Sequence, residues 1–329
     1  MKNPTFSILI LNYNGKHLLK PCIDSILKQN FTNYELVVVD NNSSDDSLLY
    51  IKENFPEIKL VENSKNFGFA KGNNKGIEVC NGEWIFFLNN DAILELDCLS
   101  ILSEHIKNRS HEQAVFMPLM LKADFPDMVD CAGDKLYPWG YAYKYEKLFA
   151  NEPKFSEFKE IALACCGAAV FNRGLLQELG GFDEDFFLYY EDVDLSLRAR
   201  HLGIKIYLIP QAKVLHKGSA TVGKKNSQRL YYIERNRFFT KLKNFPLRTL
   251  IRYVPHSFIC SVFSLIVWTK RGFLKIWIES RFSMLFGIPK MLKKRRKILS
   301  KSKISVAEFE SWLLRENFFK WLKSLIFSK

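Results

Sequence analysis

The sequence lacks the features that would place it among fibrous, disordered or membrane-spanning proteins. It has no repetitive or low-complexity segment, and its hydrophobic fraction of 47% is that of a globular protein. The mostly apolar run Tyr253–Trp268 has 16 residues and contains Pro255 and His256, whereas a membrane-spanning helix needs about 20 residues. The apolar run within Met1–Gly15 is too short for a signal peptide. We therefore expect a globular, cytosolic protein.

Cysteine is present without any pattern that indicates disulfides or a zinc finger. The seven cysteines are odd in number, and none shows the paired spacing of a metal site. Cys165 and Cys166 are adjacent within an apolar run, so we expect both to be small core residues. A chain without a disulfide framework is typical of a reducing compartment.

Acidic residues are scarce in the last third of the chain. From Tyr231 onward there are 22 Lys and Arg against 5 Asp and Glu, whereas the residues before it hold 26 and 30. The net charge of +13 therefore comes from a basic carboxyl-terminal appendage, and the body is mildly acidic. Such asymmetry is typical of a surface that binds an anionic partner, either a nucleic acid or a membrane.

Two common nucleotide-binding signatures are also missing. GxxxxGK[ST] does not occur, and no GxGxxG follows the first predicted strand. The first third of the chain instead alternates strand-like and helix-like segments. The predicted strands are Phe6–Asn12, Tyr34–Asp40, Ile58–Asn63 and Trp84–Asp91, and the predicted helices are Lys16–Gln29, Ser43–Phe55 (opened by a Ser/Asp cap) and Ala70–Cys80. This alternation predicts an α/β fold with a mostly parallel, doubly wound sheet.

Three of the predicted strands end in polar side chains. These are Asn12, Asp40 and the run Asn89–Asp91, which follows the solidly apolar "WIFFL". Asn and Asp are common in turns, so each residue alone could simply form the turn that ends its strand. The carboxyl ends of parallel strands lie at one edge of the sheet, however, where open α/β sheets bind ligands. The Gly- and Asn-rich segment Asn66–Gly76 is either a flexible turn or a loop that lets a ligand approach the backbone.

The segment Gly180–Gly203 has an aromatic run that leads into Glu191 and Asp192 at the start of a predicted helix. Either carboxylate could simply stabilise the helix terminus. The aromatic side chains could instead raise the pKa of a carboxylate and make it a general base. His216 follows a further predicted strand, where it is either a structural residue or a ligand.

Together these segments resemble the inverting family 2 glycosyltransferases of the GT-A fold, and in particular their bacterial rhamnosyltransferase-like branch. The motifs that carry the resemblance, in order, are "ILNYNG", "VVVDNNSSDDS", "NFGFAKGNNKGI", "WIFFLNNDA", "CCGAAVFNR", "GGFDEDFFLYYEDVDLSLR" and "VLHKGSAT". The resemblance covers Pro4 to Asn244, and its most specific part is the stretch from Gly180 to Arg198.

The resemblance implies a role for each matching residue. It implies that the nucleotide-sugar donor is bound by Asn12, Tyr13, Asp40, Asn66, Gly68, Asn73 and Asn90. It implies that Asp91, with His216 nearby, holds a divalent cation, Mg²⁺ or Mn²⁺, which stabilises the diphosphate leaving group. Asp192 would then be the general base and Glu191 its support. Many relatives carry Asp-X-Asp at the metal site, whereas this chain has Asn89 at the first position.

We expect a glycosyltransferase domain over residues 1–244 and a basic, aromatic-rich helical region over residues 245–329. The appendage is expected to lie on an anionic membrane surface, which places the protein at the inner face of the cell membrane and suits a lipid-linked or saccharide acceptor. Nucleic-acid binding through stacked aromatics and a simple helical cap are the alternatives for the appendage. The expected activity is sugar transfer in bacterial cell-surface polysaccharide synthesis, with dTDP-rhamnose as the best guess for the donor. Two alternatives remain for the whole chain: a sugar nucleotidyltransferase and a non-enzymatic nucleic-acid-binding module. For a glycosyltransferase we expect no nucleic-acid partner.

Overall fold

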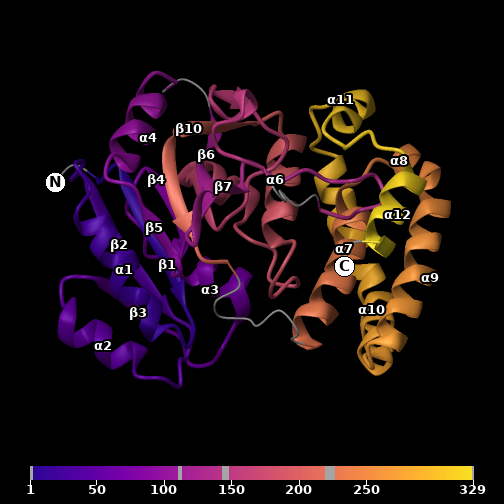
Figure 1. Cartoon of the computed structure of the whole chain (residues 1–329), viewed down its shortest axis with the longest axis horizontal. Helices are drawn as coiled ribbons and strands as arrows, with labels where there is room; N and C mark the ends of the chain where they lie inside the picture. The colour runs from indigo at the N-terminus through magenta and orange to yellow at the C-terminus, as the bar shows by residue number, and fades with distance from the viewer. Residues whose placement is uncertain (1–2, 110–112, 143–147, 219–226, 328–329) are drawn as a thin grey trace.

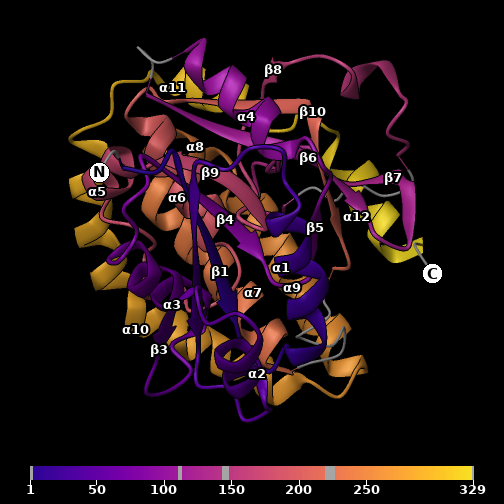
Figure 2. The same ribbon diagram turned by 90° about the vertical axis from the view of Figure 1, so that its left-hand side faces the viewer.

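Apolar strands flanked by helices build one ten-stranded sheet in the computed structural model, which describes residues 3–109, 113–142, 148–218 and 227–327. The sheet and its covering helices form one half of the molecule, and the carboxyl-terminal helices form the other half (Figure 1). Turned by 90°, the sheet half lies in front of the carboxyl-terminal helices (Figure 2). The last three residues of the motif "VLHKGSAT" lie outside the described residues.

The first four strands confirm the predicted parallel arrangement. They are β1 (Phe6–Asn12), β2 (Tyr34–Asp40), β3 (Lys59–Glu62) and β4 (Trp84–Asn89), and they lie side by side in the order β3-β2-β1-β4. In the parallel register Asn12 is paired with Asp40, and Leu11 is paired with Asn89. The polar strand ends therefore meet at one edge, as the sequence predicts.

The remaining strands extend the sheet beyond β4 with a change of direction. β9 (Ala168–Asn172) runs antiparallel to β4 and to β6 (Ala114–Lys122), and β10 (Lys205–His216) then runs parallel to β6. Short strands complete the sheet: β5 (Ala92–Leu94) and β8 (Lys159–Glu160) pair with β10, and β7 (Phe125–Cys131) pairs with β6. The sheet is thus mixed but mostly parallel, as expected.

The helices of the sheet half are α1 (Lys16–Leu27), α2 (Ser47–Asn54), α3 (Gly68–Ile77), α4 (Cys98–Lys107), α5 (Arg173–Leu179) and α6 (Glu191–His201), with a 3₁₀ turn at Pro153–Phe155. The sequence places the start of α2 four residues too early. Ser43 instead donates its backbone N–H and its hydroxyl to Asp40, which holds this segment out of the helix. The Asp45 carboxylate accepts from the backbone N–H of Ser47 at 3.1 Å, so this N–H group in the first turn of α2 has a hydrogen-bond partner.

The appendage is helical, as predicted. Its helices are α8 (Leu247–Arg252), α9 (Val254–Lys270), α10 (Leu274–Leu299), α11 (Val306–Ser311) and α12 (Phe318–Phe327), and they follow α7 (Ser227–Asn244). A second apolar core joins the two halves, because Phe186 and Val193 pack in one cluster with Phe239, Met291 and Phe309. Among the described residues, no helix combines the length and apolarity needed to cross a bilayer.

Buried charges reinforce the contact between α6 and α7. Asp194 pairs with Arg198, one turn further along α6, at 2.8 Å and also with Lys243 at 2.8 Å. Lys243 in turn contacts Asp183 at 2.6 Å, and Lys294 of α10 also pairs with Asp183. Ion pairs from α7 and α10 therefore hold the loop before α6.

Candidate active site

The carboxyl ends of β1, β2 and β4 meet in one buried hydrogen-bond network. Asn12 donates to the Asp40 carboxylate at 3.2 Å, and Asn90 donates to the side-chain oxygen Oδ1 of Asn12 at 2.8 Å. Gly15 lies against this network, and a side chain there would not fit, because its Cβ would lie 2.6 Å from Asn12 Oδ1. Tyr13 lies beside the network and is 37% exposed. Asn12, Asp40 and Asn90 thus form a rigid polar floor.

A second cluster organises the Gly- and Asn-rich loop. Asn41 donates to the Asn66 side chain at 2.9 Å and to the backbone carbonyl of Gly68 at 3.1 Å, and it is buried. Gly68 has φ +74°, and a Cβ there would lie 2.5 Å from the Phe187 carbonyl oxygen, so this position requires glycine. Asn73 is buried and donates to Phe69 within α3 at 3.0 Å, so its amide group serves the helix.

Asp91 and His216 lie next to each other, although 125 positions separate them in the chain. His216 Nε2 is 3.2 Å from the Asp91 carboxylate and 3.2 Å from the Asn89 amide nitrogen. The other ring nitrogen, Nδ1, contacts Asp130 at 2.8 Å. Burial alone would lower the pKa of His216, but its hydrogen bonds to Asp130 and Asp91 outweigh burial and raise that pKa to about 9.

These residues fit a divalent cation. A carboxylate oxygen and an imidazole nitrogen point to the same place from the ends of two strands, and both are ligand types of Mn²⁺ and related ions. Asp130, which binds the far side of the imidazole, is the kind of outer partner that orients metal-bound histidines. Sequence reasoning missed Asp130, because it lies in an antiparallel hairpin and no strand-end pattern marks it.

The turn before α6 has an unusual backbone. Phe187, Tyr189 and Tyr190 all have positive φ, at 63°, 67° and 69°. Left-handed conformations cost about 1–3 kcal/mol for residues other than glycine and persist only where neighbours enforce them. The buried amide of Asn236 on α7 enforces them here, because it donates to the carbonyls of Phe186, Leu188 and Tyr189 at 2.8, 2.9 and 2.7 Å. Sequence reasoning did not single out Asn236.

The strained turn presents Glu191 and Asp192 differently. Asp192 is half-buried and accepts from the backbone N–H groups of Val193 at 2.8 Å and Cys166 at 3.4 Å. Burial raises the pKa of Asp192. Glu191 is 5% exposed, and its Oε2 has no hydrogen-bond partner among the described residues. Burial and the neighbouring Asp192 raise the pKa of Glu191 well above its ordinary value.

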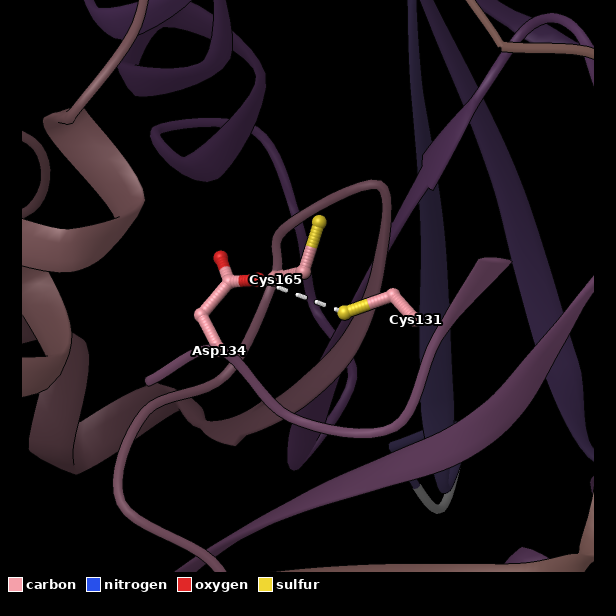
Figure 3. Close-up of side chains that lie close together, drawn as sticks. All are labelled: Cys131, Asp134 and Cys165. Atoms are coloured by element: carbon pink, nitrogen blue, oxygen red, sulfur yellow. Dashed lines mark hydrogen bonds between the residues drawn. The ribbon is translucent and has the colours of Figure 1, made fainter. Parts of the chain in front are cut away.

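Three further polar side chains gather close to Asp192. Cys131 Sγ donates to Asp134 at 3.4 Å, and Cys165 lies beside both (Figure 3). Burial and the charge of Asp192 raise the pKa of Asp134 to about 7. Cys166 is a core residue as expected, whereas Cys165 is only half-buried and lies beside this cluster. No sequence pattern pointed to Asp134.

Solved structures with a similar fold confirm the expected GT-A architecture. A crystal structure of GalNAc-T7 with UDP, GalNAc and Mn²⁺ matches 78% of this chain and 51% of its own, with a TM-score of 0.64 and 18% identity. A crystal structure of residues 1–349 of TarS from S. aureus in complex with UDP matches 90% of both chains, with a TM-score of 0.52 and 16% identity. At these identities the likeness shows the fold alone.

The curated relatives include an O-antigen biosynthesis protein, a glycosyltransferase and a hexosyltransferase. The O-antigen biosynthesis protein RfbC of Myxococcus xanthus is 26% identical over 231 residues, which is 66% of this chain and 18% of that protein. The PGL/p-HBAD biosynthesis glycosyltransferase of Mycobacterium bovis is 26% identical and matches 56% of this chain and 65% of its own. The low-salt glycan biosynthesis hexosyltransferase Agl10 of Haloferax volcanii is 25% identical and matches 70% and 74%. The chain thus spans less than two thirds of the first two of these relatives.

The family itself is established by a profile match. The sequence profile of the family described as "Glycosyl transferase family 2" matches residues 7–180. This range covers more than half of the chain and contains the strand ends that carry Asn12, Asp40 and Asp91. The chain therefore belongs to glycosyl transferase family 2.

Proposed function

We propose that this glycosyltransferase moves a sugar from a nucleotide-sugar donor to a saccharide or lipid-linked acceptor in cell-surface polysaccharide synthesis, with inversion at the anomeric carbon. The observation that carries the proposal is the placement of Asp91 and His216 at one sheet edge, together with Asp192 on the strained turn. Open α/β sheets bind ligands at this edge. A sugar nucleotidyltransferase is less well supported, because Tyr13–Gly15 after β1 offers no Gly-rich basic loop for a triphosphate.

The donor's nucleotide is proposed to lie over the polar floor. Asn12, Asp40 and Asn90 are held by one another, which pre-organises the pocket before the donor binds. Tyr13 is exposed beside them and suits contact with the base. The loop that carries Asn66 and Gly68 would close over the sugar end, with Asn73 supporting it from α3. dTDP-rhamnose remains the first donor to test, and UDP, named for both similar structures, makes UDP-sugars the next.

Asp192 is proposed to accept the proton of the acceptor hydroxyl. As that oxygen attacks the anomeric carbon, the bond from this carbon to the diphosphate oxygen breaks, and its electron pair leaves with the nucleoside diphosphate. One base on the opposite side of the ring gives a single displacement and therefore inversion. Glu191 is proposed to support Asp192: it is buried, and burial raises its pKa, which favours the protonated form. The backbone N–H groups of Val193 and Cys166 keep the Asp192 carboxylate oriented.

Asp91 and His216 are proposed to hold Mg²⁺ or Mn²⁺, which when bound supplies positive charge to the diphosphate. Asp130 fixes the imidazole ring so that Nε2 faces Asp91. Asn89 occupies the position of the first aspartate in the Asp-X-Asp motif of many relatives. The motif therefore offers the cation one carboxylate, that of Asp91, instead of two. We therefore expect weak binding of the cation to the protein alone and tighter binding when a nucleoside diphosphate contributes its oxygens.

The appendage is proposed to lie on the cytoplasmic surface of the cell membrane. Large apolar side chains of α8, α9 and α10 remain at least 40% exposed: Leu247, Ile251, Val254, Phe258, Val262, Ile266, Ile278, Phe282, Leu285 and Phe286. Patches of this kind beside basic residues suit an anionic lipid interface. Trp268 of α9 is buried and does not belong to this surface. Within the basic run Lys293–Lys297, Lys294 and Arg295 are engaged in internal contacts, while the other three residues are exposed.

A donor panel tests the proposed activity. Thermal unfolding is measured with a set of nucleotide sugars in the presence of Mg²⁺ or Mn²⁺, and transfer or donor hydrolysis is assayed for those that bind. We expect one donor class to raise the melting temperature only with the cation present. The matched Asp91→Ala variant should lose the cation-dependent part of this shift. A protein that responds to no nucleotide sugar would contradict the proposal.

A further inference from the structure

Cys131, Asp134 and Cys165 form a compact cluster of potential ligands outside the Asp91–His216 pair. Their ligand atoms all lie within 4.8 Å of one another, and the Cys131 Sγ to Asp134 Oδ1 distance is 3.4 Å. Cys131 is the last residue of β7, and Figure 3 shows it facing Asp134 along a hydrogen bond, with Cys165 beside them on a second segment of the chain. The backbone N–H of Asp134 donates to the Leu163 carbonyl at 2.9 Å, which ties the two loops together.

We propose that this cluster binds a thiophilic divalent cation, with Zn²⁺ as the best fit. Zinc takes tetrahedral sets of sulfur, nitrogen and oxygen ligands, with Zn–S bonds of about 2.3 Å. Ligand atoms of such a set are separated by about 3.5 Å, close to the 3.4 Å between Cys131 and Asp134. Two thiols and one carboxylate leave the fourth position to water. Mg²⁺ prefers oxygen ligands, so this site selects a different ion from the one expected at Asp91.

Access and charge balance are both compatible with this site. Asp134 and Cys165 are half-buried, so a cation reaches the cluster from solvent. The two thiols release their protons to solvent as two Zn–S bonds form, and the ion is then held by two thiolates and one carboxylate. No electron is transferred and no co-reactant is needed. The long separation of Cys131 and Cys165 in the chain explains why cysteine spacing did not reveal the site.

The position of the cluster gives the cation a consequence for catalysis. Asp192 lies against the same loop, where it accepts from the Cys166 N–H group at 3.4 Å. A cation next to Asp192 stabilises its carboxylate form and so weakens it as a proton acceptor. Zn²⁺ should therefore slow sugar transfer. This consequence rests on the proposed function, whereas the binding of the cation does not.

Binding is tested on the full chain in a phosphine reductant, with Cd²⁺ as a spectroscopic stand-in for Zn²⁺. We expect one equivalent of Cd²⁺ to produce the ultraviolet thiolate-to-cadmium charge-transfer band, and added Zn²⁺ to remove it. Cys131→Ala and Cys165→Ala should weaken binding by more than about 10–100-fold, the loss caused by removing even an outer-shell partner. Cys98→Ala is the matched control, since Cys98 is equally buried but lies on α4.

Absence of the band in the parent, or an equal loss of the band in Cys98→Ala, would overturn the site. Asp134→Asn guards against misfolding of the cysteine variants, because it retains both thiols and the side-chain shape. It should keep the band but weaken Cd²⁺ binding, and unchanged affinity would exclude Asp134 as a ligand. Inhibition is measured separately: Zn²⁺ should slow transfer by the parent but not by Cys131→Ala. If Cd²⁺ binds and Zn²⁺ has no effect on transfer, the link to Asp192 is wrong while the site stands.

Discussion

Asn236 is the residue whose removal should most clearly separate the strained turn from the rest of the fold. Its side chain is fully buried, and its amide donates to three backbone carbonyls at 2.7–2.9 Å. Asn236→Ala removes both N–H donors without adding bulk. The Phe186 carbonyl keeps the backbone N–H of Leu188 and the Arg235 guanidinium as partners, so the carbonyls of Leu188 and Tyr189 are the two that lose theirs. At about 1–3 kcal/mol for each buried carbonyl left without a partner, the loss is about 2–6 kcal/mol in total.

The three left-handed residues extend the effect of this change to the position of Asp192. Phe187, Tyr189 and Tyr190 are held in conformations that cost about 1–3 kcal/mol each. Without Asn236 the turn relaxes toward ordinary φ values, and α6 then no longer presents Asp192 in the same direction. Transfer should fall together with stability. Donor binding should weaken as well, because the Phe187 carbonyl accepts from the backbone N–H groups of Phe69 and Ala70, next to the proposed donor loop.

The free energy of unfolding is measured by urea denaturation, alongside the initial transfer rate and donor affinity. Asn54→Ala is the matched control, because Asn54 makes a comparable bond to Tyr50 at 2.9 Å but is exposed. The control should stay within about 0.5 kcal/mol of the parent. If Asn236→Ala also stays within that range and keeps parental turnover, the turn does not depend on Asn236 and the reasoning fails.

Three further predictions address the base, the membrane surface and the buried charges. Asp192→Asn keeps the side-chain shape but loses the proton acceptor, so transfer should fall by about 10²–10⁴-fold with near-parental donor affinity; near-parental turnover would rule out Asp192 as the base. Phe286 on α10 is 83% exposed, and Phe286→Glu should weaken binding to anionic vesicles by about tenfold or more. The control Phe125→Glu on β7 should leave vesicle binding unchanged. Equal effects of the two variants would contradict the proposal that this surface binds the membrane. Burial would raise the pKa of Asp183, but the ammonium groups of Lys243 and a second lysine outweigh it and hold that pKa far below its ordinary value. Because the unfolded state binds the proton of Asp183 more tightly, the stability that this carboxylate contributes is present above about pH 4 and is lost as the pH falls below it. Urea unfolding from pH 7 to pH 3 should show this loss as a decrease in the free energy of unfolding. Asp183→Asn should make that free energy depend less on pH.

The parallel part of the sheet and the helix at Glu191 could be predicted because local patterns determine them. Solid apolar runs such as "WIFFL" have few stable alternatives to a buried strand, and parallel strands bring their carboxyl ends to the same edge. The convergence of Asn12 and Asp40 on one edge follows from this rule, and the structure pairs the two residues directly. The placement of Asp91 at that edge follows in the same way.

Only the tertiary structure decided which distant side chains complete the site. Asp130 contacts His216, Asn236 holds the turn before Asp192, and Cys131 meets Cys165, although each pair is separated by more than 30 positions. No nearest-neighbour pattern encodes such contacts, because they depend on how the β7 hairpin and α7 pack against the sheet half. The sequence alone therefore determined the sheet edge and the helix that carry the candidate site, while long-range packing determined the partners that orient its side chains.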